Sequence, residues 1–237
     1  MLRTRFYLIC AIAWLCRTVG AMASPLAPCP LPLEKGMQWT YEGKVEWTEA
    51  NSTVVLTTNV HWVMEVVDVM EQGEVRASVV RGMPEELAWY EPKQQPGFNV
   101  LLAISNRVYR ILVNSEKEGE SVGRTLTKDY SKMPPTAEEW LALPLAKGQH
   151  WGRDTERDDN KYCWYVEDGS VKNPKVEGFQ ADSRVTSWTL AYRTNPDYQI
   201  MEIVDGLGVT RYSYVHHGTV ASADVRLVSF KRPNTTK

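Results

Sequence analysis

The segment Gly119-Glu120-Ser121-Val122-Gly123 has the G-x-S-x-G spacing of a serine nucleophile. Such a serine lies between a strand and a helix, on a sharp turn that lifts its hydroxyl above a parallel sheet. The residues before the segment, 114–118, are too polar for a central strand, and Arg124-Thr125-Leu126-Thr127 opens a helix poorly. We therefore interpret residues 114–123 as a solvated surface turn or loop without a catalytic serine.

Four histidines offer imidazole groups for catalysis or metal binding: His61, His150, His216 and His217. No H-E-x-x-H or C-x-x-C pattern occurs. Adjacent residues on a strand point to opposite faces, so His216 and His217 do not easily share one metal ion. The sequence predicts exposed or hydrogen-bonded histidines, and no metal or other cofactor. If a site exists, its imidazoles come from His61 and one of the adjacent pair.

Acidic residues alternate at Asp154, Glu156 and Asp158, with the spacing of the first three ligands of a calcium loop. The position that requires glycine is Asp159, and the final glutamate position is Tyr165, so we interpret the segment as a solvated acidic loop. The adjacent carboxylate pairs at 85–86 and 138–139 do not indicate a catalytic acid and base, because such pairs are identified by their positions in the folded structure and not by adjacency in sequence.

The elements that must position these residues are nearly all strands. Alternating apolar and polar residues, separated by turn signals, predict about ten strands. They cover residues 38–47, 53–70, 74–80, 100–104, 107–113, 162–166, 184–193, 198–204, 209–215 and 219–230. One short helix is expected near 135–143, because Thr136 and Glu139 have capping-box spacing. With no βαβ units, the pattern predicts a mainly β fold, an antiparallel sandwich or an open or half barrel.

Tryptophan is unusually frequent, with nine residues in the chain. Large flat side chains suit the half-buried faces of sheets, and they also line ligand grooves. Most of these tryptophans are expected in the core. The candidates for lining a ligand are Trp39, Trp62, Trp151 and Trp188.

Residues 1–23 have the features of a cleavable signal peptide. Arg3 and Arg5 precede an apolar run at 6–16, which is too short to span a bilayer, and Ala21-Met22-Ala23 provides a cleavage site before Ser24. No later segment is apolar for the roughly 18 residues of a membrane-spanning helix. The sequence therefore predicts an exported, periplasmic or secreted, soluble domain at 24–237.

The mature chain would be mildly acidic, since removing three arginines leaves 24 basic side chains against 29 acidic ones. This balance, without basic clusters, argues against nucleic acid or an anionic membrane as the main partner. Two cysteines remain after cleavage, Cys29 and Cys163, in a compartment that permits disulfides. Bridged or free thiols are both compatible with the sequence, because spacing does not place the two Cβ atoms.

Two segments repeat the pattern L-P-L-x-K-G-x-x-W, at residues 31–39 and 143–151. In each, the proline holds an extended lead, Lys-Gly forms a turn, and the tryptophan enters the sheet. The repeat has two interpretations: two related halves at about 31–130 and 143–230 within one domain, or reuse of one strand-entry device.

The first copy also carries a PL-x-x-G-x-x-W-x-Y element, formed by Pro32, Leu33, Gly36, Trp39 and Tyr41. With Gly206-Leu207-Gly208-Val209 near the other end, the chain resembles uncharacterised exported bacterial proteins. The resemblance covers two short motifs. It implies an exported β-rich fold in the bacterial envelope and no assigned activity.

Three hypotheses of function follow. The first is a non-enzymatic domain that binds an apolar small molecule, a lipid chain or an envelope partner, because it is rich in tryptophan and lacks catalytic motifs. The second is a hydrolase of envelope or extracellular substrates, using His61, His216 or His217, Ser121 and the acidic loop. The third is a structural or assembly protein. A groove of aromatic residues would favour the first, and a cleft that pairs histidine with aspartate or serine would favour the second.

Overall fold

The computed structural model describes residues 30–49, 51–152, 159–180, 184–217 and 221–233. The expected signal peptide at 1–23, Cys29 and most of the acidic loop, 154–158, lie outside these ranges. No helix among the described residues is long and apolar enough to span a bilayer.

Within the described ranges, twelve strands form one antiparallel sheet and there is one α-helix, which confirms the mainly β fold. The strands are β1 Gln38–Thr48, β2 Val55–Gln72, β3 Val75–Arg81, β4 Phe98–Ile104, β5 Arg107–Val113, β6 Glu138–Ala142, β7 His150–Gly152, β8 Cys163–Lys172, β9 Val185–Arg193, β10 Asp197–Val204, β11 Gly208–His216 and β12 Ala221–Lys231. Their order in the sheet is β6-β5-β4-β3-β2-β1-β12-β11-β10-β9-β8-β7.

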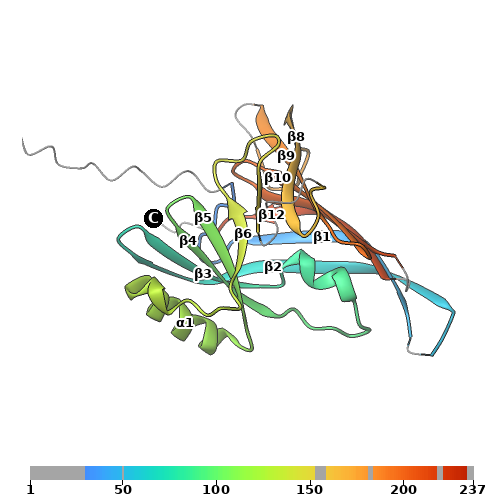
Figure 1. Ribbon diagram of the computed structural model, residues 1–237, viewed down its shortest axis with the longest axis horizontal. Coiled ribbons are helices and arrows are strands. Elements are labelled where there is room, and N and C mark those ends of the chain that lie inside the picture. Colours follow the sequence, from blue (N-terminus) through green and yellow to red (C-terminus); the bar gives the residue numbers. More distant parts are fainter. Residues whose placement is uncertain (1–29, 50, 153–158, 181–183, 218–220, 234–237) are drawn as a thin grey trace, which may run out of the picture.

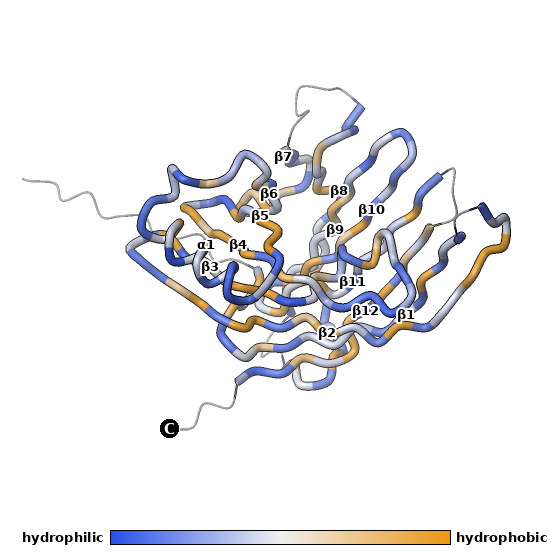
Figure 2. The backbone as a smooth tube through the Cα atoms, turned by 90° about the horizontal axis from the view of Figure 1, so that it is seen from below, coloured by the Kyte–Doolittle hydropathy of each residue, from blue (hydrophilic) through white to orange (hydrophobic). Residues whose placement is uncertain are grey.

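The sheet curls strongly (Figure 1), so that its two edge strands, β6 and β7, lie beside each other (Figure 2). No strand ladder joins them within the described ranges. A side chain bridges the gap instead, because Trp151 of β7 donates its indole N–H to the carbonyl of Trp140 on β6 at 3.3 Å. The result is a nearly closed barrel. Strands that follow each other in sequence are neighbours in it, and β1 pairs with β12.

Strand alternation produces the inner core. On β12, Ala223, Val225 and Leu227 are buried, whereas Asp224 and Arg226 face solvent. The same alternation of apolar and polar residues can be followed along the strands in Figure 2. The largest side chains on the inner surface are fully buried, and they include Trp39, Trp140, Trp151, Tyr41, Tyr212, Tyr214 and Phe230.

The helix is not where the sequence predicted it. Residues 138–142 form β6, which pairs with β5 through Val108 and Leu141 and buries Trp140. Thr136 and Glu139 have the spacing of a helix cap, but pairing with β5 and burial of the apolar side chains stabilise a strand there. Local helix propensity is thereby overridden by the sheet.

The one α-helix, α1 at Glu116–Lys128, lies where a surface loop was expected. Ser115 is its N-cap and accepts a hydrogen bond from the backbone N–H of Glu118 at 3.3 Å. The Glu118 side chain in turn accepts from the backbone of Asn114 at 2.8 Å. The helix covers the outer face of β2 to β5 (Figure 1), where a second apolar cluster includes Ala77, Val79, Ile111 and Leu126.

The G-x-S-x-G segment forms the packing face of this helix. Gly119 and Gly123 are buried one turn apart, and Ser121 is exposed. A Cβ on Gly119 would lie 2.8 Å from Val79 Cγ1, and a Cβ on Gly123 would lie 2.6 Å from Met70 Cε. The two glycines therefore allow the helix to approach the sheet closely, and no nucleophile elbow is formed.

The two L-P-L-x-K-G-x-x-W segments make the same backbone hydrogen bonds. Gly36 donates to the carbonyl of Val66 at 2.8 Å, and Gly148 donates to that of Val166 at 2.9 Å. Each glycine has a positive φ, 84° and 83°, which favours glycine at the turn. Lys35 then pairs with Asp68 at 2.9 Å and Lys147 with Asp168 at 3.2 Å.

The strands that receive these segments also match. β2 has a bulge between Val66 and Asp68, and β8 has one between Val166 and Asp168. Trp39 is paired with Met64 and Trp151 with Trp164, so both motif tryptophans enter the sheet at equivalent positions. β1 to β6 and β7 to β12 are therefore two sets of six strands that begin with the same local structure.

Candidate binding site

The segment between β3 and β4, residues 82–97, positions Trp89, the most exposed aromatic side chain in the part of the chain that the structure describes. It contains the 3-10 helix η1 at Pro84–Trp89, which lies against β1, β11 and β12. Glu86 fastens both ends of the segment. Its carboxylate accepts from the backbone N–H of Met83 at 3.1 Å, from that of Gly97 at 2.8 Å and from the amide of Asn99 at 3.0 Å.

The neighbouring Glu85 anchors the segment to the interior. Its carboxylate is buried and accepts the indole N–H of Trp140 at 2.7 Å. Arg110 lies 4.0 Å from the same carboxylate and also pairs with Glu138 at 2.5 Å. Burial acts to lower the pKa of the Arg110 guanidinium, but the negative charges of Glu85 and Glu138 have the larger effect, so the pKa is raised. The two adjacent glutamates thus hold η1 in place from opposite sides.

At the end of η1, Trp89 is 56% exposed and rests on two other rings. Its ring centroid lies 4.8 Å from that of His216 and 5.7 Å from that of Tyr214. Because the segment 82–97 is fastened at both ends by Glu86, we infer that the indole is held in one orientation at the surface.

Asp197 holds the two supporting rings. Its Oδ1 lies 2.8 Å from His216 Nδ1 and accepts the Tyr214 hydroxyl at 2.7 Å, while Thr194 donates to Oδ2 at 3.1 Å. Partial burial works to raise the pKa of Asp197, and these three hydrogen bonds outweigh it, so the pKa is lowered. The carboxylate therefore stays ionised and keeps the rings in place below Trp89.

A groove of about 500 Å³ lies beside Trp89. Trp47 and Tyr90 contact each other edge to face at 5.3 Å and form its aromatic wall with Trp89. Its polar lining residues are Thr48, Glu49, Asn51, Ser52 and Glu91. The groove can pack a flat apolar surface against indole and phenol rings while its polar side chains bond to neighbouring hydroxyl or amine groups.

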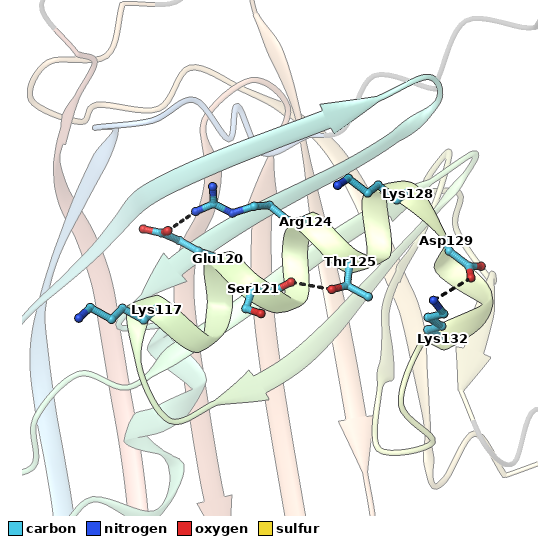
Figure 3. A pocket seen from close by; sticks show the side chains of 8 residues that line it. All are labelled: Lys117, Glu120, Ser121, Arg124, Thr125, Lys128, Asp129 and Lys132. Atoms are coloured by element: carbon cyan, nitrogen blue, oxygen red, sulfur yellow. Dashed lines mark hydrogen bonds and ion pairs between the residues drawn. The ribbon is translucent and has the colours of Figure 1, made fainter.

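A second, shallow depression of about 440 Å³ runs along the outer side of α1 (Figure 3). Its charged side chains largely pair with one another: Arg124 with Glu120, and Lys132 with Asp129 at 3.5 Å. Ser121 lies there as an exposed helical residue, and no histidine lines the depression. Paired, solvent-exposed charges on a helix surface give no apolar contact for a ligand and no base for a serine.

The four tryptophans named as candidates for lining a ligand are packed in the inner core or against it, and ligand binding by them stays a prediction. Trp39 donates to the carbonyl of Leu207 at 2.6 Å, Trp62 to that of Gly82 at 2.9 Å, and Trp151 to Trp140. Trp188 is partly buried over Gly169. None of the four lines the aromatic groove, which is formed by Trp47, Trp89 and Tyr90.

The residues of the hydrolase hypothesis lie on separate elements. His61 is exposed on β2, 3.4 Å from Glu42, Ser121 is on α1, and His216 is on β11 beside Asp197. Among the described residues, no group of three or more histidine, cysteine or acidic side chains could hold a metal ion. Cys163 is buried on β8, and a bridge to Cys29 stays a prediction because Cys29 lies outside the described residues.

No family model matches the chain, and no curated protein matches it significantly. Solved structures similar to it include that of a "putative lipoprotein" from Parabacteroides distasonis ATCC 8503. It is 11% identical, with 86% of this chain and 99% of that chain covered and a TM-score of 0.44. Another is that of a "putative exported protein with YmcC-like fold" from Bacteroides fragilis NCTC 9343. It is 12% identical, with 85% and 98% covered and a TM-score of 0.42.

Proposed function

We propose that the protein is an exported bacterial envelope domain that binds a neutral glycan in the aromatic groove, without converting it. The observation that carries the proposal is the fixed, exposed Trp89. Leaving a large apolar side chain in water forgoes roughly 1.5–3 kcal/mol of burial free energy. Here the indole is also supported by two rings and by a segment fastened at both ends, which is the preorganisation a binding surface needs.

The chemistry of the groove favours a sugar chain. The apolar face of a pyranose ring packs flat against an indole, and its hydroxyls require donors and acceptors at the edge. Asn51, Ser52, Glu49 and Glu91 provide these groups. The two carboxylates disfavour acidic polysaccharides by repulsion, so the preferred ligand is uncharged.

Packing of the interior argues against a lipid chain as the ligand. The inner surface of the sheet is filled by buried aromatic and aliphatic side chains, and η1 lies against β1, β11 and β12. A lipid chain would have to displace these groups, whereas a glycan at the rim displaces only water. Export is proposed from the sequence, on the basic start, the apolar run and the A-x-A site of residues 1–23.

The test is titration of the full chain with a panel of neutral and N-acetylated oligosaccharides, followed by tryptophan fluorescence and calorimetry. Replacing Trp89 by alanine removes the stacking surface, and we expect at least a tenfold loss of affinity. Tyr130 is the matched control, because it is 54% exposed but lies on η2, Tyr130–Lys132, outside the groove. Tyr130→Ala should bind like the unmodified protein.

Three results would overturn the proposal. The first is the absence of saturable binding to any sugar in the panel, and the second is undiminished binding by Trp89→Ala. The third is binding of basic peptides in place of sugars, which would make the groove a polypeptide site. Reducing-end analysis of the same mixtures tests for hydrolysis, and release of smaller sugars would contradict the non-enzymatic assignment.

A further inference from the structure

The two sets of six strands differ at one matched inner position. Ser78 on β3 pairs with Val69, the residue after Asp68, and Trp188 on β9 pairs with Gly169, the residue after Asp168. Since Asp68 and Asp168 mark the same bulge, Ser78 and Trp188 occupy equivalent places in the two sets. A small hydroxyl side chain thus stands where the other set has an indole.

In the second set, the indole fills the inner surface. A Cβ on Gly169 would lie 2.5 Å from Trp188 Cζ3, so the ring lies directly over this glycine. The Asp205 carboxylate lies beside Trp188 and Thr186; burial raises its pKa, and these two side chains act to lower it. The space between β8, β9 and β10 is therefore closed by one large side chain.

In the first set, the corresponding region is a partly open cavity of about 230 Å³. Arg76 and Ser78 on β3 and Leu101 and Ala103 on β4 form its wall, and the extended lead at residues 31–34 covers it. Ala103 pairs with Arg76, and the equivalent Asp205 donates its backbone N–H to the carbonyl of Thr186 at 3.0 Å. The first set thus lacks both the indole and the carboxylate beside it.

Two polar groups that line this cavity have unused hydrogen-bonding capacity. The Ser78 hydroxyl is fully buried, and neither it nor Arg76 Nε has a partner among the described residues. The other guanidinium nitrogens of Arg76 bond the Leu33 carbonyl at 2.5 Å and Glu71 at 2.9 Å. Buried polar groups are nearly always paired, so two orphans at one cavity indicate a missing acceptor.

We propose that this cavity binds a short-chain monocarboxylate. The carboxylate would accept hydrogen bonds from Arg76 Nε and the Ser78 hydroxyl, and the alkyl chain would pack on Leu31, Leu33 and Leu101. Arg76 has hydrogen-bond donors and no acceptor, so its guanidinium cannot accept a hydrogen bond from an alkylammonium ligand. The site is separate from the aromatic groove, so the inference stands independently of glycan binding.

The experiment is titration of the isotope-labelled full chain with hexanoate, followed by two-dimensional amide NMR. We expect saturable shifts in β3, β4 and residues 31–34, with a dissociation constant on the order of 0.1–1 mM for so small a ligand. Hexylammonium should cause no saturable shift. Ser78→Trp copies the second set and should abolish binding, whereas Leu112→Trp adds an indole at an exposed position on β5 and should not.

Two conservative variants keep the test decisive if Ser78→Trp does not fold. Ser78→Ala removes only the hydroxyl, and Arg76→Lys keeps the charge but removes Nε, so each should weaken hexanoate binding several-fold. Absence of saturable hexanoate binding overturns the proposal. So does a Ser78→Trp protein that folds and binds hexanoate as tightly as the unmodified chain, or unchanged affinity in both conservative variants.

Discussion

Replacing Gly119 by alanine tests whether the G-x-S-x-G segment serves packing. The new methyl group would lie 2.8 Å from Val79 Cγ1 and 3.4 Å from Val113 Cγ2. Val79 is fully buried and β-branched, so its χ1 is stiff and the helix or the sheet must shift. Gly119→Ala should therefore destabilise the protein although alanine is the better helix former.

The magnitude is a difference of two opposing effects. Overpacking a filled site costs about 1–3 kcal/mol, and the change from glycine to alanine in a helix returns about 1 kcal/mol. We expect a net loss of up to about 2 kcal/mol for Gly119→Ala. At Gly123 the nearest atoms are Met70 Cε at 2.6 Å and Sδ at 2.9 Å. A flexible thioether can move aside, so Gly123→Ala should be neutral or stabilise by up to about 1 kcal/mol.

Urea unfolding of the full chain, monitored by tryptophan fluorescence, gives the free energy of unfolding of both variants. An unchanged m-value shows that only the stability has changed. Thermal midpoints should differ by about 2–4 °C for each kcal/mol in a protein of this size. Ser121→Ala is the control at the exposed position and should remain within about 0.5 kcal/mol of the unmodified protein. Equal destabilisation by both alanine substitutions would refute the argument, because it would mean that the identity of the facing side chain does not matter.

Three further predictions concern the polar groups around η1. The pKa of Asp197 is lowered in the fold, so its contribution is present at neutral pH and is lost as the pH falls through the folded-state value. Asp197→Asn should therefore be less stable than the unmodified protein at pH 7, and it should lose less stability between about pH 5 and pH 2. The same pH dependence of the urea unfolding free energy in both proteins would contradict this. Trp140→Phe removes the donor to buried Glu85 and should cost about 2–3 kcal/mol, partly recovered by adding Glu85→Gln; an unchanged urea midpoint would be inconsistent with a structural anchor. Glu86→Gln weakens the acceptor of the Gly97 N–H and should speed hydrogen exchange of that amide at least tenfold, so unchanged protection would rule out the fastening role.

Alternation of apolar and polar residues sufficed to predict most of the sheet, because along most strands one face packs in the core and the other faces water. The helix was misplaced because Thr136 and Ser115 both begin an S/T-x-x-E pattern, and only pairing with β5 decides between them. The polar surface of α1 conceals two buried glycines, whose role depends on Val79 and Met70 of other strands. Local propensity contains no information about such partners.

The repeated L-P-L-x-K-G-x-x-W pattern predicted two equivalent strand entries, and their hydrogen bonds are the same. Descent of the halves at 31–130 and 143–230 from one unit stays a prediction. The aromatic groove could not be predicted, since Trp47 and Trp89 come from distant segments that meet only where η1 lies against β1. One local signal exists, because Trp89-Tyr90 precedes the polar turn at 91–97 and large aromatic residues beside such turns are often exposed.

The pairing of β1 with β12 has a consequence for the order of folding. Ser222 on β12 bonds to Glu46 on β1 across 176 residues of sequence. Until β12 is synthesised, β1 presents a row of unpaired backbone groups, which is a template for association with other chains. Closure of so long a loop is slow, and a nascent chain remains vulnerable to aggregation throughout that time. A carrier that keeps the chain unfolded until all twelve strands are available would remove this hazard.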